Sequence, residues 1–164
     1  MGEDAANAKS VNLVKSLIHN VGVVIVGFAV ACLGATADSL LGWPGFKNAL
    51  AITAGWSLIA IGFLLRVWAT FLFYERRMRV IVLVPQKQLI TTGPYRFSRN
   101  PLYLGGNVFI FLGAALFLGS PGGLMLTVAA VIAGDFMIRR EEKQLEREFG
   151  DEWLHYKSQV RRWL

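Results

Sequence analysis

The chain has 164 residues, of which 54% are hydrophobic and only 17% are charged. This composition is too apolar for an ordinary soluble domain of that length, and it predicts a membrane protein. The formal net charge of +6 does not call for a nucleic-acid partner, because basic residues beside a bilayer meet anionic lipid headgroups. Cys32 is the only cysteine, which excludes an intramolecular disulfide.

Four apolar segments are long enough to cross a bilayer, whose core of about 30 Å needs roughly 20 helical residues. They are residues 17–37, 48–74, 101–119 and 121–138. The sequence GSPGG at 119–123 is a turn signal that separates the last two segments. We therefore predict an all-α integral membrane protein with about four transmembrane helices, organised as a single domain over residues 1–164. Residues 35–37 resemble a signal-peptide cleavage site, but the apolar run before them is long, so we expect a retained helix.

Lysine and arginine are distributed unevenly around these segments. They are concentrated before the first segment, between the second and third, and after the fourth, whereas Lys47 lies on the other side. Short cytoplasmic loops collect positive charge. We therefore expect both termini and the loop at residues 75–100 (the basic loop) to be cytoplasmic, in the inner membrane if the protein is bacterial.

The last part of the chain predicts a charged helix that leaves the bilayer, followed by an amphipathic helical segment. Residues 139–149 continue the fourth span with charged residues, Gly150 suits a helix end, and Asp151 suits the cap of a new helix. This helix either lies on the membrane surface or folds back over the basic loop. Its apolar stripe comprises Trp153, Tyr156, Val160, Trp163 and Leu164.

Charged residues in the apolar segments need partners. Arg66 lies well inside the second segment, and it either extends to the interface or meets an anionic partner in a cavity. In the fourth helix, Asp135, Arg139 and Glu142 share one face, and Glu141 points elsewhere. These groups form either a solvated interfacial cluster or a site that grips ligand hydroxyl or ammonium groups.

Residues 91–105 form a basic, proline-containing stretch with aromatic side chains at Tyr95, Phe97 and Tyr103. Pro101 suits the first position of a helix, whose free N–H groups bind carboxylate or phosphate. As an ordinary cytosolic loop, this stretch would need only its positive charges.

Several sequence blocks, in this order, resemble the isoprenylcysteine carboxyl methyltransferases and their phospholipid-methylating relatives. The resemblance covers residues 55–164, and the combination is specific where each block alone would be weak. The blocks are GW at 55–56, LRVWA at 65–69, LITTGPYR at 89–96, RNPLYLG at 99–105, EE at 141–142, FGDEW at 149–153, and Tyr156. The first helix carries no such signature.

The resemblance implies methyl transfer from S-adenosylmethionine to a lipophilic acceptor that enters from the bilayer. The positions that match cofactor contacts of the family are Lys87, Gln88, Leu89, Ile90, Tyr95, Asn100, Pro101, Leu102, Tyr103 and Glu141. Glu142 is close enough in register to be the contact in place of Glu141. We take Arg66, Arg99 and Glu142 as candidate catalytic residues, and we expect no metal.

Two positions depart from the family pattern. Asn100 stands where the family usually has histidine, and Met137 stands where it has an arginine one turn before the glutamates. Arg139 or Arg140 could replace that arginine.

The expected reaction is in-line displacement at the sulfonium methyl, with positioning as the main source of rate. An isoprenylcysteine-type carboxylate needs no general base, whereas an amine or hydroxyl of a related small lipid does. Glu142 could serve as that base, while solvent exposure or interface packing is the expected fate of His19 and His155. Two other functions stay open at this point: a membrane reductase of the sterol-reductase type that uses NADPH, and a non-catalytic scaffold or lipid binder.

Overall fold

The computed structural model of the chain describes residues 2–80 and 87–164, and this part is helical without strands. Four of its helices are long and apolar enough to span a membrane, which confirms the predicted fold class. The helices are α1 (Gly2–Leu41), α2 (Ala49–Glu75), the short 3₁₀ turn η1 (Gly93–Arg96), α3 (Pro101–Tyr103), the π-helical segment η2 (Leu104–Ile110), α4 (Phe111–Leu118), α5 (Pro121–Phe149) and α6 (Asp151–Gln159). Residues 81–86 of the basic loop lie outside the described residues.

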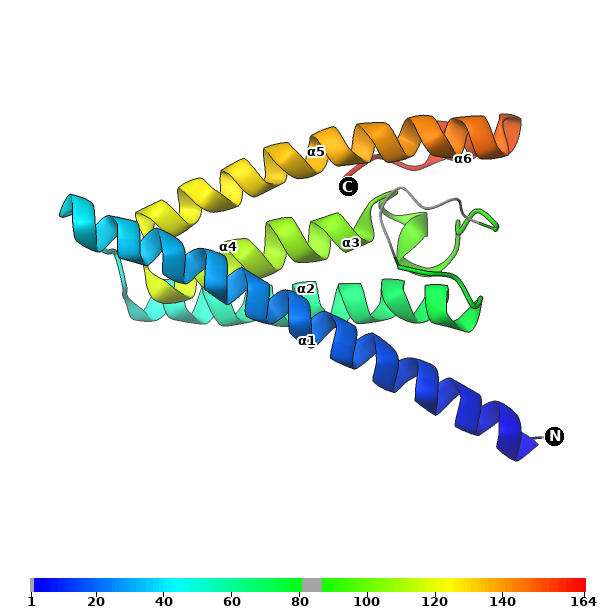
Figure 1. Ribbon diagram of the computed structural model, residues 1–164, viewed down its shortest axis with the longest axis horizontal. Helices are drawn as coiled ribbons and strands as arrows, with labels where there is room; N and C mark the ends of the chain where they lie inside the picture. The colour runs from blue at the N-terminus through cyan, green and yellow to red at the C-terminus, as the bar shows by residue number, and fades with distance from the viewer. Residues whose placement is uncertain (1, 81–86) are drawn as a thin grey trace.

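α2, the third span and α5 run along the same direction while α1 crosses them obliquely, and the chain reverses direction at both ends of the bundle (Figure 1). The N-terminus, the described part of the basic loop and α6 lie at one end, which we call the loop end. The connections between α1 and α2 and between α4 and α5 lie at the other, the turn end. The predicted basic segments therefore gather on one side, and their assignment to the cytoplasm stays a prediction.

The helix boundaries follow local signals in the sequence. The side chain of Asn48 caps α2 by accepting a hydrogen bond from the backbone N–H of Ala51 at 2.9 Å. The hydroxyl of Ser120 caps α5 by accepting from the N–H of Gly123 at 2.8 Å, and Gly119 ends α4 at φ 65°. α1 is longer than the apolar run at 17–37, because the polar residues before that run continue the same helix.

Glycines let the third span pack against its neighbours at backbone distance. A Cβ atom on Gly62 of α2 would lie 2.5 Å from the carbonyl oxygen of Gly105 in η2, and one on Gly55 would lie 2.6 Å from that of Gly113 in α4. Without a hydrophobic driving force between helices in lipid, such close approach is a main source of association. The third span is consequently seated directly on α2.

A buried carboxylate joins α1 to α5 at the turn end. Asp38 is 6% exposed, and it accepts hydrogen bonds from the Ser120 hydroxyl at 2.5 Å and from the Gly122 N–H at 2.7 Å. Its negative charge lies at the N-terminus of α5, where the helix dipole is positive. One helical turn earlier, a Cβ on Gly34 would lie 2.1 Å from the backbone nitrogen of Gly123.

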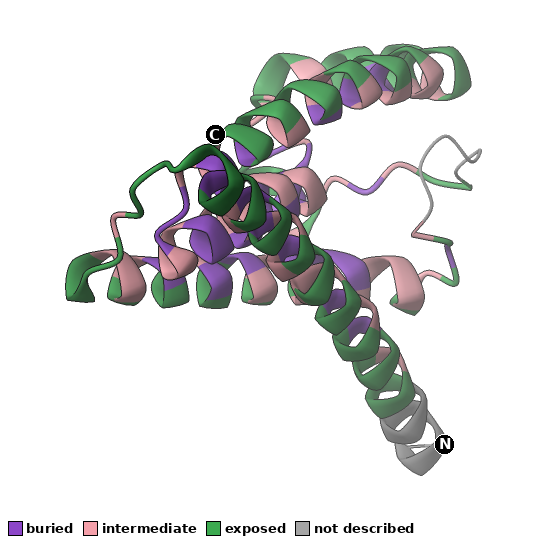
Figure 2. Cartoon of the chain, turned by 60° about the vertical axis from the view of Figure 1, so that its left-hand side comes forward, coloured by how far each residue is buried: buried purple, intermediate pink, exposed green. Residues whose placement is uncertain are grey.

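The outward faces of the long helices are exposed and apolar, as lipid contact requires (Figure 2). Large side chains such as Ile18, Leu33, Leu64 and Phe136 are more than half exposed. In water such a surface would promote aggregation. It fits a chain whose surroundings at this level are acyl chains.

Replacing Gly34 by alanine should destabilise the bundle by about 1–3 kcal/mol, because the added methyl group collides with the backbone of α5. The measurement is thermal unfolding in a neutral detergent. Gly22→Ala is the matched control, since a Cβ there meets nothing within 4 Å and alanine favours helix. Equal melting temperatures for the two variants would contradict this account of α1–α5 packing.

Candidate functional site

A cavity of about 320 Å³ lies at the loop end, at the lower end of the range typical of small-molecule sites. Every long helix and the basic loop contribute to its wall. The lining residues are His19, Arg66, Phe73, Met78, Val80, Gln88, Leu89, Ile90, Tyr95, Asn100, Leu102, Tyr103, Asn107, Glu141, Gln144, Leu145, Glu148, Trp153 and Tyr156. We call it the loop-end cavity.

One wall is formed by the turn that enters the third span. Gly93 has φ 62°, and a Cβ there would lie 2.8 Å from the side chain of Leu72, so glycine allows the turn to approach α2. The turn buries Tyr95, whose backbone carbonyl accepts a 2.7 Å hydrogen bond from the hydroxyl of Tyr156. Burial raises the pKa of both tyrosine hydroxyls, so Tyr156 is a protonated donor at neutral pH.

A hydrogen bond across the cavity joins the third span to α5. The Tyr103 hydroxyl donates to Glu141 Oε1 at 3.1 Å, and both side chains line the loop-end cavity. Of the two adjacent glutamates, Glu141 is therefore the one that faces this space.

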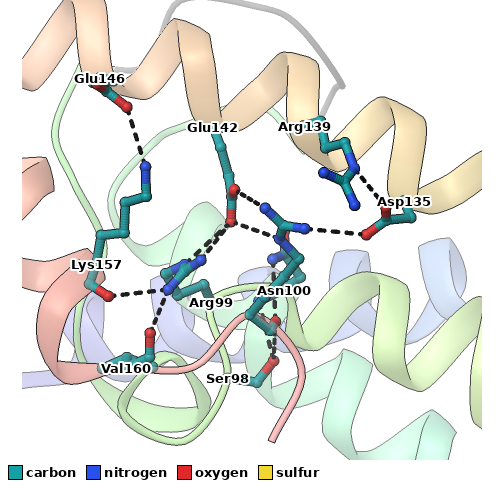
Figure 3. A network of polar contacts seen from close by, with 10 residues as sticks. Ser98, Arg99, Asn100, Asp135, Arg139, Glu142, Glu146, Lys157 and Val160 are labelled. Carbon is teal, nitrogen blue, oxygen red and sulfur yellow. Dashed lines mark hydrogen bonds and ion pairs between the residues drawn. The ribbon is translucent and has the colours of Figure 1, made fainter.

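Glu142 lies on another face of α5 and holds two arginines (Figure 3). Its carboxylate is 2.8 Å from Arg99 Nη2 and 2.6 Å from Arg162 Nη2, and Glu142 is 6% exposed. Arg162 also reaches Asp135 at 3.4 Å. The hydrogen bond with Glu142 is the main cause of a raised pKa for the Arg162 guanidinium. Asp135, Arg139 and Glu142 share a face as predicted, with Asp135 and Arg139 paired at 2.7 Å.

The same arginines attach the end of the chain to the basic loop. Arg99 Nη1 donates to the carbonyl oxygens of Lys157 at 3.1 Å and Val160 at 2.5 Å, as Figure 3 shows. The Arg99 backbone N–H donates to the Arg161 carbonyl at 3.0 Å. The Asn100 side chain donates to the Arg162 carbonyl at 3.2 Å. Of the two predicted placements, α6 thus takes the one that folds back over the loop.

Two details of the predicted last helix are wrong. α6 begins at Asp151, so Gly150 precedes it as the cap residue and no side chain caps the helix. α6 ends at Gln159, so the stripe predicted to run through Leu164 is helical only at Trp153 and Tyr156. The C-terminal segment (residues 160–164) is not helical, because its backbone carbonyl groups accept hydrogen bonds from residues of the basic loop.

Arg66 does not extend to the interface. It is 8% exposed, its Nε donates to Asn20 Oδ1 of α1 at 2.8 Å, and its Nη1 donates to the Leu102 carbonyl. Gly105 and Gly106 leave room for this side chain, since Cβ atoms there would lie 2.7 and 2.9 Å from Arg66 Cγ and Nη1. The interpretation that Arg66 snorkels is therefore wrong, because neighbouring helices enclose it beside the cavity.

Most of the residues predicted to bind the cofactor are brought together. Those that line the loop-end cavity are Gln88, Leu89, Ile90, Tyr95, Asn100, Leu102, Tyr103 and Glu141, and the candidate catalytic residue Arg66 joins them. Lys87 is exposed and Pro101 is buried, and neither belongs to the lining of the described chain. Arg99 and Glu142 also lie outside the lining and form the ion-pair network instead.

Sequence reasoning did not assign several lining residues to the site. His19 was expected to be solvent-exposed or packed at the interface, and Trp153 and Tyr156 were expected in an amphipathic stripe, yet all three line the cavity. Tyr156 and Trp153 belong to sequence blocks that resemble the methyltransferases, so that signal was present. For His19 the sequence carries no signal, because its place depends on how α1 crosses the bundle.

Fold and site together define an all-helical membrane protein with a cavity at the loop end of its four spans. The sequence model of the family described as phospholipid methyltransferase matches residues 50–152, which is more than half of the chain. The chain belongs to the phospholipid methyltransferase family. It is also 43% identical over 58 residues to an uncharacterized protein of Haemophilus influenzae, a match that covers 35% of this chain and 92% of that protein. No solved structure matches the chain.

The lining fits the chemistry of S-adenosylmethionine, the cofactor generally used in this family. The aromatic rings of Tyr95 and Tyr156 offer stacking surface, and Glu141 offers a carboxylate for an ammonium or hydroxyl group.

Replacing Glu142 by alanine should destabilise the protein by about 3 kcal/mol, because it leaves two arginines without their buried counter-charge. Hydrogen exchange should speed up in α6 and the C-terminal segment before the rest of the chain. The matched control is Glu146→Ala, which breaks a pair with Lys157 whose side chains are 46% and 39% exposed and should cost less than about 1 kcal/mol. Equal losses in the two variants would refute the role given to Glu142.

Proposed function

We propose that the protein transfers a methyl group from S-adenosylmethionine to a lipophilic acceptor, an isoprenylcysteine-type carboxylate or a related small lipid. Family membership supports the reaction class. The observation that carries the placement is the hydrogen bond between Tyr103 and Glu141, which joins two blocks of the family signature, residues 99–105 and 141–142, at one cavity.

In this proposal the residues of the loop-end cavity bind and orient the cofactor. Glu141 accepts hydrogen bonds from its ammonium or hydroxyl groups, and Tyr103 fixes the orientation of that carboxylate. Residues 88–90 and 100–102 supply the surrounding backbone and apolar wall. When bound, S-adenosylmethionine supplies the transferable methyl as a substituent of a sulfonium.

The protein's contribution to the reaction is then position and exclusion of water. Walls from α2, α5 and α6 hold the two reactants in line, which is worth several orders of magnitude in rate. A carboxylate acceptor is already ionised at neutral pH and needs no general base. For an amine or hydroxyl acceptor, His19 is the neutral base candidate in the lining.

In this proposal Arg99 and Glu142 do not contact the reactants, and they hold the elements that form the cavity in place. Their ion pair fixes the turn at Asn100 and holds α6 against the basic loop. Asn100 stands where the family has histidine. Its side-chain amide also holds the C-terminal segment against the basic loop, because it donates to the Arg162 carbonyl. Arg139 and Arg140 are exposed and outside the lining, so neither replaces the missing family arginine inside the cavity.

Glu141→Ala should weaken binding of S-adenosylhomocysteine by about tenfold to a hundredfold, because a hydrogen-bonded carboxylate is lost from the cavity. Isothermal titration calorimetry of purified protein in neutral detergent provides the measurement. Glu146→Ala is the control on the same helix, as it is exposed and outside this cavity. Unchanged affinity in Glu141→Ala would place the cofactor elsewhere.

Membranes that contain the protein should transfer label from methyl-labelled S-adenosylmethionine to an extractable lipid. The lipid fractions tested are N-acetyl-S-farnesylcysteine, as the carboxylate acceptor, and phosphatidylethanolamine, as the amine acceptor. Membranes with the Glu141→Ala variant serve as control. Labelling of neither fraction, together with thermal stabilisation by NADPH and none by S-adenosylhomocysteine, would favour the reductase alternative.

A further inference from the structure

A groove of about 520 Å³ is formed at the loop end by α5, α6 and the C-terminal segment. We call it the cationic groove, because five basic and two acidic side chains line it and give it a formal net charge of +3. The lining residues are Arg139, Glu142, Lys143, Glu146, Arg147, Lys157 and Arg162. None of them lines the loop-end cavity, so the groove is a separate feature of the molecule.

The acidic side chains of the groove already have cationic partners. Glu142 binds Arg99 and Arg162, and Glu146 pairs with Lys157 at 3.3 Å. The cations on the α5 side are in a different situation. No ion pair within the described residues involves Lys143 or Arg147. Three cations of α5 are therefore available to an external anion.

The third of these cations is Arg139, whose intramolecular pair is weak. Its side chain is 59% exposed and meets Asp135 at 2.7 Å, four residues earlier on the same helix (Figure 3). Exposed pairs of this kind contribute at most about 1 kcal/mol, because water solvates both partners. The guanidinium of Arg139 can therefore also donate to a ligand phosphate at the groove.

These three cations continue an apolar face of α5. Side chains that are more than half exposed recur along the fourth span at intervals of three or four residues, and they are Met125, Val128, Ile132 and Phe136. Arg139, Lys143 and Arg147 follow at the same intervals, and residues spaced in this way share one side of a helix. The face changes from apolar to cationic at the predicted end of the span, residue 138.

An anionic phospholipid has the same order of chemical groups, since its acyl chains lie in the bilayer core and its phosphate lies at the interface. Ammonium and guanidinium groups form charge-assisted hydrogen bonds with phosphate. Each basic residue close to an anionic leaflet contributes about 1 kcal/mol of attraction. A soluble phosphate or an acidic protein segment would use the cations alone and leave the adjoining apolar face without a role.

We propose that the cationic groove binds the phosphate of an anionic phospholipid whose acyl chains pack along the apolar face of α5. The inference goes beyond the proposed function, because this lipid is a bound component and not the methyl acceptor. Its phosphate lies beside Glu142 and Arg162, which hold the C-terminal segment in place.

The test measures lipid binding to the full chain in neutral detergent by native mass spectrometry. Dioleoylphosphatidylglycerol is the anionic probe, and dioleoylphosphatidylcholine has the same acyl chains without a net charge. Wild type should bind the anionic lipid at least about tenfold more tightly than the neutral one. The double variant Lys143→Gln/Arg147→Gln should lose about tenfold or more of the affinity for the anionic lipid, because two cations beside the phosphate are removed.

The matched control is Lys9→Gln/Lys15→Gln, which removes the same charge from exposed positions of α1 that do not line the groove. This variant should bind both lipids as wild type does. Without added lipid, both double variants should melt at the wild-type temperature, because the substituted side chains are exposed. Soluble glycerol phosphate carries the phosphate without acyl chains, and it should bind far more weakly than the lipid.

The proposal is overturned if wild type binds the two lipids equally, or if the two double variants lose equal affinity, since diffuse charge would then explain the binding. Glycerol phosphate that binds as tightly as the lipid would assign the groove to a soluble phosphate. Tighter binding of polyglutamate than of the anionic lipid would assign it to an acidic protein. None of these measurements depends on methyl transfer, so failure of the proposed function leaves this test intact.

Discussion

A buried carboxylate between two guanidinium groups holds the candidate site in shape. Glu142 lies where α5 reaches the loop end, and it binds Arg99 of the basic loop and Arg162 of the C-terminal segment. The basic loop also packs Met78, Ile90 and Tyr95 against Ala69 of α2 in a buried hydrophobic cluster. The C-terminal segment is held by this charge and by the hydrogen bonds of its carbonyl groups. These contacts and the hydrogen bond from Tyr156 to the Tyr95 carbonyl hold α6 in place, so that Trp153 and Tyr156 close one side of the loop-end cavity. Charge burial of this kind is a weak source of stability, but it allows few alternative arrangements.

α5 uses its two adjacent glutamates for different tasks, and helix geometry explains the division. Consecutive residues on a helix point about 100° apart, so Glu141 faces the cavity while Glu142 faces the arginines. A shift of one residue would exchange a cavity-facing carboxylate for one that binds the two arginines. Two adjacent glutamates in one helical turn therefore have different partners. Glu142 fixes the basic loop and the C-terminal segment, and Glu141 places a carboxylate at the cavity.

The sequence was sufficient for the spans, because apolar length and the turn at Gly119 are local properties. The resemblance to a known family also brought Tyr103 and Glu141 into one predicted site, and the structure places the two side chains in contact. Their binding of a cofactor stays a prediction. The sequence was insufficient wherever the outcome depends on which helix lies beside which. His19 and Asn20 belong to a helix without signature residues, and their neighbours are fixed by how α1 crosses α2. Whether the Arg66 side chain points to the membrane interface or into the bundle likewise depends on Gly105 and Gly106, about forty positions away in the sequence, which leave space for it.

The π-helical segment η2 changes the direction in which the side chains at the start of the third span point. A π-helical turn accommodates one more residue than an α-helical turn, so it is equivalent to a one-residue insertion. Everything before Leu104 is thereby turned by about 100° relative to α4, compared with a regular helix. Without the extra residue, Tyr103 would be turned by about this angle from the direction in which it meets Glu141 of α5. A homologue that lacks one residue between 104 and 110 could keep its four spans and its fold, while the residues equivalent to Tyr103 and Glu141 would no longer meet.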